Sequence, residues 1–187
     1  MRLVQGVGIN DVPGAVKTKE YRLWSDMLIR SYDEKLHQRQ PTYLDCETSS
    51  EFLVFSKFHN WCQSQIGFNQ PTFELDKDLL EKGNKEYHPD KCVFIPRVIN
   101  SALKTKKRSR GDLPIGVTKN KIGSYIAQLN DSLGKIYLGS FSTPEQAFQV
   151  YKHAKENHIK LLAEKYRDQI DPRAYEALLS YKVEITD

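Results

Sequence analysis

Tyr125-Ile-Ala-Gln-Leu-Asn-Asp131 and Gly134-Lys-Ile-Tyr-Leu-Gly-Ser-Phe141 are the stretches that decide the fold. In both, side chains alternate with the two-residue period of half-buried strands. Asn130 to Gly134 supplies turn-forming residues, so a β-hairpin is predicted. Thr143-Pro-Glu-Gln146 then reads as a helix start, with a capping Thr, a Pro at the first helical position and a Gln that closes a capping box. One face of that helix is expected to cover the hairpin, because apolar residues continue at helical spacing: Ala147, Val150, Tyr151, Ala154, His158, Leu161 and Leu162.

The predicted sheet has an apolar inner face and a polar outer face. The residues expected to face the helix are Tyr125, Ala127, Leu129, Ile136 and Leu138. Those expected to point away are Thr118, Asn120, Ser124, Gln128, Asn130, Lys135 and Tyr137, with basic neighbours at Lys119 and Lys121. Asn and Gln pair with adenine edges, and Lys pairs with guanine or phosphate, so this face has the chemistry of a DNA-reading surface. An ordinary solvated sheet face is the alternative.

This stretch resembles the AP2/ERF DNA-binding domain of plant transcription factors, which is also attached to phage homing endonucleases. The matching segments are Gly116-Val117, Tyr125-Ile-Ala-Gln-Leu, Lys135-Ile-Tyr-Leu-Gly-Ser-Phe, Thr143-Pro-Glu-Gln-Ala and Tyr151. The resemblance implies a three-stranded sheet laid into the DNA major groove with the helix behind it. The chain departs from the family where Thr118, Asn120 and Asn130 replace arginines and Ile122 replaces a tryptophan.

The charge distribution agrees with this placement. Residues 1–100 carry 13 Lys and Arg against 14 Asp and Glu, whereas residues 101–140 carry 8 against 2. Positive charge is therefore concentrated where phosphate contact would need it. Three widely separated cysteines, Cys46, Cys62 and Cys92, without a Cys-x-x-Cys pair, favour free thiols in a reducing compartment. The start of the chain lacks a signal peptide's apolar core and no long apolar run is present, so a cytoplasmic protein is expected.

The first hundred residues are expected to contain two amphipathic helices before a strand–loop–strand–helix unit. Lys17 to Tyr32 has an aromatic stripe at helical spacing. Thr48 and Glu51 have capping-box spacing ahead of a second helix. Phe73-Glu-Leu-Asp-Lys-Asp, a polar loop and Val93-Phe-Ile-Pro then predict two strands, followed by a helix that begins near Pro96.

This unit resembles the HNH endonuclease motif, and more closely phage proteins with Leu-Asp-Lys-Asp, Gly-Asn-Lys and Cys-Val-Phe-Ile-Pro. The resemblance implies that Asp76 and Asn100 bind a divalent metal such as Mg²⁺, and that Asn84 orients the general base. Lys77 stands where the family has its general-base His, and an ordinary lysine is protonated near neutral pH. His88, in the loop, is the candidate substitute; an exposed loop histidine in a nuclease-derived scaffold is the alternative.

The expected organisation is an α+β protein in three parts. Residues 1–100 form the HNH-like module with its N-terminal helices, 101–112 a basic linker, and 113–187 the AP2/ERF-like domain with a C-terminal helix. The linker's cations are further candidates for phosphate contact: Lys104, Lys106, Lys107, Arg108 and Arg110.

Three functions are compatible with these motifs. The first is a DNA-binding protein derived from a phage homing endonuclease, acting on double-stranded DNA in the bacterial cytoplasm. The second is an active metal-dependent endonuclease that nicks or cuts DNA. The third is a phage effector that binds a host protein. No membrane partner is expected.

Overall fold

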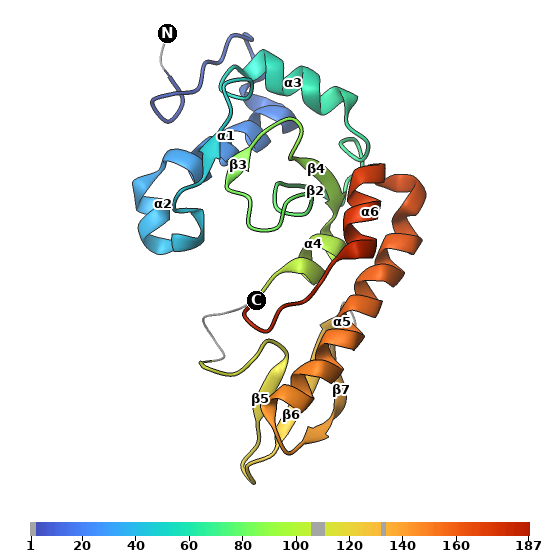
Figure 1. The fold of residues 1–187 in the computed structure, drawn as a ribbon. Helices are drawn as coiled ribbons and strands as arrows, with labels where there is room; N and C mark the ends of the chain where they lie inside the picture. Colours follow the sequence, from blue (N-terminus) through green and yellow to red (C-terminus); the bar gives the residue numbers. More distant parts are fainter. Residues whose placement is uncertain (1–2, 106–110, 132–133) are drawn as a thin grey trace. The chain divides into compact units, whose positions relative to one another are not determined.

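The computed structural model describes residues 3–105, 111–131 and 134–187 (Figure 1). Within these ranges the chain forms six α-helices and three small sheets, which confirms the predicted α+β class. It divides into two compact units: unit 1 is Met1–Pro96 with Gln169–Ala174, and unit 2 is Arg97–Asp168 with Tyr175–Asp187. No helix in the described part is both long and apolar enough to cross a membrane.

The first α-helix of unit 1 carries the predicted aromatic stripe. A 3-10 turn, η1 (Ala15–Lys17), precedes α1 (Lys19–Tyr32), and the Thr18 hydroxyl caps α1 by accepting from the Tyr21 N–H at 3.2 Å. Trp24 is fully buried, and its indole N–H donates to the Phe52 carbonyl at 2.6 Å. This bond ties α1 to the chain that leads into the next large helix. The short α2 (Glu34–Arg39) and η2 (Pro41–Tyr43) follow α1.

The second predicted helix begins later than its capping pattern indicated. α3 spans Phe55–Ser64, and Thr48 instead belongs to β1 (Glu47–Thr48). The start of α3 is bonded by a residue far away in sequence, because the Asp11 carboxylate accepts from the Ser56 N–H at 2.9 Å and from the Ser56 hydroxyl. The capping box at Thr48 was therefore a wrong prediction: a long-range carboxylate satisfies the helix terminus that a local one was expected to cap. The apolar side chains of α3 are buried as expected.

Two small sheets complete unit 1. The predicted strands are β2 (Phe73–Asp76) and β4 (Val93–Pro96), which pair antiparallel with Asp76 opposite Val93. The sequence did not indicate β1 or its parallel partner β3 (Glu86–Tyr87), each two residues long. The turn η4 (Arg167–Gln169) leads into α6 (Pro172–Ser180). In the first turn of α6, Arg173 donates to the Asp171 carboxylate and to the Asp90 carbonyl at 3.1 Å, and residues 169–174 belong to unit 1.

Unit 2 begins with α4 (Arg97–Leu103), which follows β4 without a break in the chain. Residues 101–103 of the expected linker are thus helical. Lys104 is exposed, whereas Lys106, Lys107, Arg108 and Arg110 lie outside the described residues.

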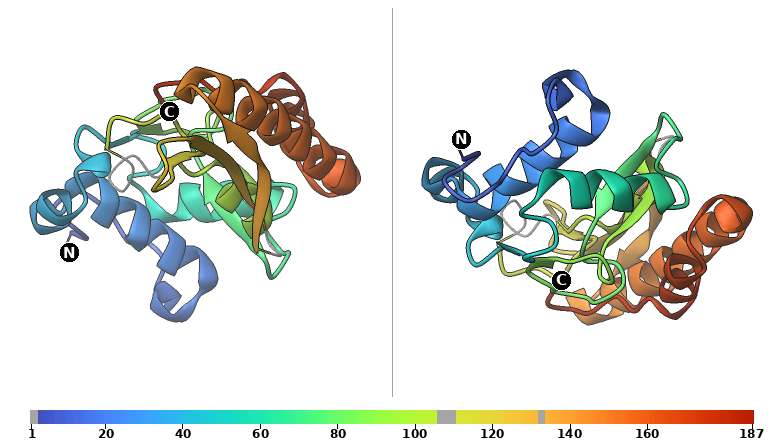
Figure 2. Two further views of the ribbon diagram at one scale, coloured as in Figure 1. Left: turned by 90° about the horizontal axis from the view of Figure 1, so that it is seen from below. Right: turned by 90° about the horizontal axis from the view of Figure 1, so that it is seen from above.

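The centre of unit 2 is an antiparallel sheet in the order β5 (Val117–Lys119), β6 (Tyr125–Asp131) and β7 (Gly134–Phe141). The long helix α5 (Pro144–Tyr166) lies along one face of it (Figures 1 and 2). The Thr143 hydroxyl caps α5 by accepting from the Gln146 N–H, as predicted. Between the two layers is a buried core: Ile115, Val117, Ala127, Leu129, Ala147, Phe148, Tyr151 and Val183.

One residue of the predicted inner face is not covered by the helix. Ile136 pairs with the buried Leu129 and so has the expected side of the sheet, but it is 41% exposed. It lies on an edge strand, where the residues from Gly134 to Tyr137 are all exposed. Alternation gives the face of a residue but not the length of strand that the helix covers.

Candidate nucleic-acid interface and the Asp76 loop

The outer face of the unit 2 sheet is defined by its register. Ile126 lies between Thr118 and Ser140, Gln128 is paired with Tyr137, and Asn130 is paired with Lys135. Partners in a sheet project to the same side. Because Ala127 and Leu129 point into the core, these seven side chains point away from α5.

A bulge in β7 makes this arrangement. Ala127 pairs with Gly139 and Gln128 pairs with Tyr137, so Leu138 has no partner in β6. Tyr137 and Ser140, three residues apart, would face opposite sides of a regular strand, whereas the bulge puts both on the outer face. Gly139 accommodates the change with φ of 139°, a value that disfavours other residues. The strict alternation used on the sequence therefore missed Ser140 as an outer-face residue, and Gly139 was the available signal. Ile126 has the same parity as Gln128 and Asn130, and it was omitted from the expected outer face although alternation places it there.

The side chains at the β7 end of this face are available to a ligand. Tyr137 is 66% exposed. Among the residues that the structure describes, Gln128, Asn130 and Lys135 use no side-chain polar atom in a hydrogen bond or ion pair. Their amide and ammonium groups are free to meet base edges or phosphates.

The β5–β6 turn uses one predicted contact residue for its own structure. The Asn120 side-chain oxygen accepts from the backbone N–H groups of Ile122 and Ser124, at 3.1 and 2.9 Å. The turn is thereby pinned, and Ile122 stands at its tip, 87% exposed. Lys121 is exposed beside it, and Lys119 lies with its ammonium 5.5 Å from the centre of the Tyr125 ring. Lys121 remains a candidate for phosphate contact, whereas Lys119 is paired with Tyr125 and therefore projects to the α5 side of the sheet. The Asn120 side-chain oxygen is already occupied.

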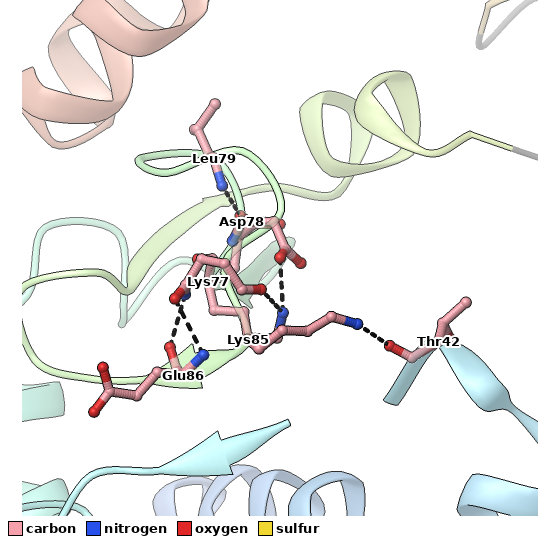
Figure 3. Close-up of polar contacts among 8 residues, drawn as sticks. Thr42, Lys77, Asp78, Leu79, Lys85 and Glu86 are labelled. Atoms are coloured by element: carbon pink, nitrogen blue, oxygen red, sulfur yellow. Dashed lines mark hydrogen bonds and ion pairs between the residues drawn. The ribbon is translucent and has the colours of Figure 1, made fainter. Parts of the chain in front are cut away.

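Asp76 is the last residue of β2, Lys77 and Asn84 lie in the loop that follows it, and His88 comes directly after β3. Figure 3 shows the polar contacts of Lys77 in this loop. One oxygen of the Asp76 carboxylate accepts from the backbone N–H groups of Asp78 and Leu79, at 2.9 and 2.8 Å. Burial raises the pKa of the Asp76 carboxyl above its ordinary value, while the Leu79 N–H opposes this shift. Asp76 therefore acts as an internal cap of this loop.

Lys77 is buried, and its ammonium makes two hydrogen bonds. Its ammonium donates to the Asp78 carboxylate at 2.7 Å and to the Asn84 carbonyl at 2.6 Å. The Asn84 side chain in turn donates to the carbonyls of Lys77 and Glu86, both at 2.7 Å. Asn84 thus binds the backbone of residue 77. The side chain there ends in an ammonium whose protons are held by two acceptors, which is the opposite of a general base.

His88 is not arranged to replace the missing base. Its Nδ1 lies 3.1 Å from the Asp90 backbone N–H, which can only donate. The neutral ring consequently carries its proton on Nε2 and uses the Nδ1 lone pair for this bond. In that tautomer the bond occupies the only basic lone pair of the ring, and an Asp90 carboxylate oxygen lies 3.7 Å from the same nitrogen.

The residues present do not fit a divalent-cation site. An Asp76 oxygen already serves two amides, and the adjacent Lys77 adds a positive charge. Throughout the described ranges, no group of three or more His, Cys, Asp or Glu side chains is placed to hold a metal ion. Asn100 lies on α4, the helix that directly follows β4. Cys46, Cys62 and Cys92 are buried free thiols, and burial raises the pKa of Cys92 to about 12.

Comparison with known proteins gives no relative. No protein-family model, curated protein or solved structure matches this chain.

Proposed function

We propose that this protein binds double-stranded DNA through the outer face of the β5–β6–β7 sheet, and that it is a phage protein derived from a homing endonuclease. The observation that carries the proposal is the row of unpaired Gln128, Asn130 and Lys135 beside the exposed Tyr137 on a sheet backed by a helix. The major groove admits a β-ribbon, and these are side chains that pair with base edges and phosphates.

The charge of the chain supports the same surface. Residues 101–140 carry 8 basic and 2 acidic residues. Lys121 lies in the β5–β6 turn and Lys135 lies at the start of β7, and both are exposed. Cations at the edges of a polar face favour contact with the two phosphate backbones that border a groove. The resemblance of this region to AP2/ERF domains points the same way.

For unit 1 we propose a nuclease-derived scaffold that no longer cuts DNA. The order β2, β4, α4 follows the ββα order of HNH enzymes, and this order is what favours the second candidate function, metal-dependent cleavage. Against cleavage stand the buried, engaged Lys77 and the committed Nδ1 of His88. A scaffold that has lost catalytic activity but kept the ββα order accounts both for the order of the elements and for the bonded Lys77 and His88.

The test is incubation of the purified protein with supercoiled plasmid, with and without Mg²⁺ or Mn²⁺, followed by gel electrophoresis. We expect retarded but intact DNA under all conditions. The control is Asp76→Ala. Metal-dependent nicking that this variant abolishes would establish a live nuclease and overturn the proposal for unit 1, while absence of any retardation at low salt would overturn DNA binding.

A further inference from the structure

The outer face of the unit 2 sheet has an uneven chemistry along its length. At the level of Ile126, its cross-strand neighbours are Thr118 and Ser140, so this row offers methyl groups and hydroxyls. The next row offers the Gln128 amide and the Tyr137 ring, and the last offers the Asn130 amide and the Lys135 ammonium. Of these seven side chains, one is cationic, and it lies at the end of the sheet.

The four base pairs present different groups to such a face. Adenine offers an acceptor and a donor that a Gln or Asn amide matches with two hydrogen bonds. Thymine offers a methyl group that packs against aliphatic side chains such as Ile or Thr. Guanine offers two acceptors, which Arg or Lys matches best.

We propose that this face selects an A·T-rich DNA site. The Gln128 and Asn130 amides pair with adenines, and the Ile126 and Thr118 side chains pack against thymine methyl groups. At one end, the Lys135 ammonium donates to a guanine or to a phosphate. The inference rests on the proposed function, since it names the class of DNA that the same surface takes.

A cation outside the central rows is placed to raise the affinity for DNA without affecting which bases are chosen. Lys121 lies in the β5–β6 turn, outside the central rows, whereas Lys119 projects to the α5 side of the sheet. Contacts from the turn to phosphates strengthen binding to every sequence alike, and so leave the choice of bases to the neutral rows. The bulge at Leu138 is part of this selection, because it brings Tyr137 and Ser140 to the same face.

The inference is tested by repeated selection from a duplex library with a randomised central segment, using the full-length protein, followed by sequencing. We expect an enriched motif whose central positions are A·T pairs, with G tolerated at one end. Exchange of a central A·T pair for G·C should weaken binding about tenfold, the discrimination of one bidentate contact.

Two variants show whether the face itself makes the choice. Asn130→Arg should move one motif position to G, because a guanidinium matches the guanine edge. The matched control is Gln149→Arg, an exposed change on α5, which should leave the motif unchanged. A G·C-rich motif, binding without sequence preference, or an unchanged motif for Asn130→Arg would overturn the inference while leaving DNA binding intact. Failure of the parent protein to retain any duplex at low salt would overturn the proposed function itself.

Discussion

Gln128 on β6 lies opposite Tyr137 on β7, although its neighbour Ala127 lies opposite Gly139. The unpaired Leu138 between these two pairs shifts the register by one residue. The result is an outer face on which amide, phenol, hydroxyl and ammonium groups from three strands lie together, and this face is the surface proposed to bind DNA.

Removal of single groups from this face should weaken DNA binding. Lys135→Ala and Tyr137→Ala should each lower affinity for a preferred duplex by about 1–3 kcal/mol if they contact bases, or less for a phosphate contact. Fluorescence anisotropy at fixed salt measures this loss. Lys160→Ala, which removes the same charge from an exposed position on α5, is the control. Parent-like affinity in both sheet variants would show that another surface binds DNA.

The packing of α5 on the sheet depends on a glycine. Gly116 has φ of 75°, and a methyl group there would lie 2.0 Å from the Tyr151 ring. Gly116→Ala should therefore destabilise unit 2 through both backbone strain and overpacking, each of which costs about 1–3 kcal/mol. Thermal unfolding followed by circular dichroism measures the change.

Gly123→Ala separates the two costs, because Gly123 also has a positive φ, of 91°, but open space around it. It should cost the strain alone. Equal effects of the two substitutions would argue against the close approach of Gly116 to Tyr151.

The C-terminal tail should be part of the sheet domain. Val183 is buried in its core, the Val183 N–H donates to Glu156 at 3.0 Å, and the Val183 carbonyl accepts from Lys152 at 2.6 Å. Val183→Ala should cost about 1–3 kcal/mol of unfolding free energy. Ile185→Ala, at a 45% exposed position in the same tail, should cost less than about 0.5 kcal/mol. If urea denaturation gave the same midpoint for both variants, the tail would not be docked as described.

Attachment of this tail should weaken in acid. Burial favours the neutral form of Glu156, but the Val183 N–H and the nearby Lys182 and Lys152 outweigh it and lower the pKa of its carboxyl. A lowered pKa contributes stability above the unfolded-state value that is lost as pH falls through the folded-state value. The melting temperature of the parent should thus fall more steeply below about pH 4.3 than that of Glu156→Gln. Parallel pH profiles would contradict this role.

We expect Lys77 to stabilise the loop that follows β2. Lys77→Met keeps the buried stem but leaves the Asn84 carbonyl without its ammonium partner, which should cost about 1–3 kcal/mol. Lys85→Met removes an exposed bond to the Thr42 carbonyl and should cost less than about 0.5 kcal/mol. Denaturant unfolding compares the two. A Lys77→Met protein as stable as the Lys85→Met protein would show that the network around Asn84 does not support the loop.

Local patterns predicted much of this fold from the sequence. The hairpin, the Thr143 cap and strands β2 and β4 followed from alternation and turn chemistry, which act over a few residues. What the sequence could not supply came from distant contacts: the Asp11 carboxylate that binds the start of α3, the two-residue pair β1–β3, and the burial of Val183. At the candidate interface, alternation placed Gln128 and Lys135 on the outer face but missed Ser140, because a bulge changes the period within one strand.

The central claim is tested most directly by following the backbone amide signals of the ¹⁵N-labelled protein by NMR while an A·T-rich duplex is added at low salt. The account predicts that the largest shifts occur at Thr118, Ile126, Gln128, Asn130, Lys135, Tyr137 and Ser140, with little change at the exposed α5 positions His153 and Lys160. Shifts concentrated on α5 or in the Asp76 loop, or no shifts at all, would contradict it.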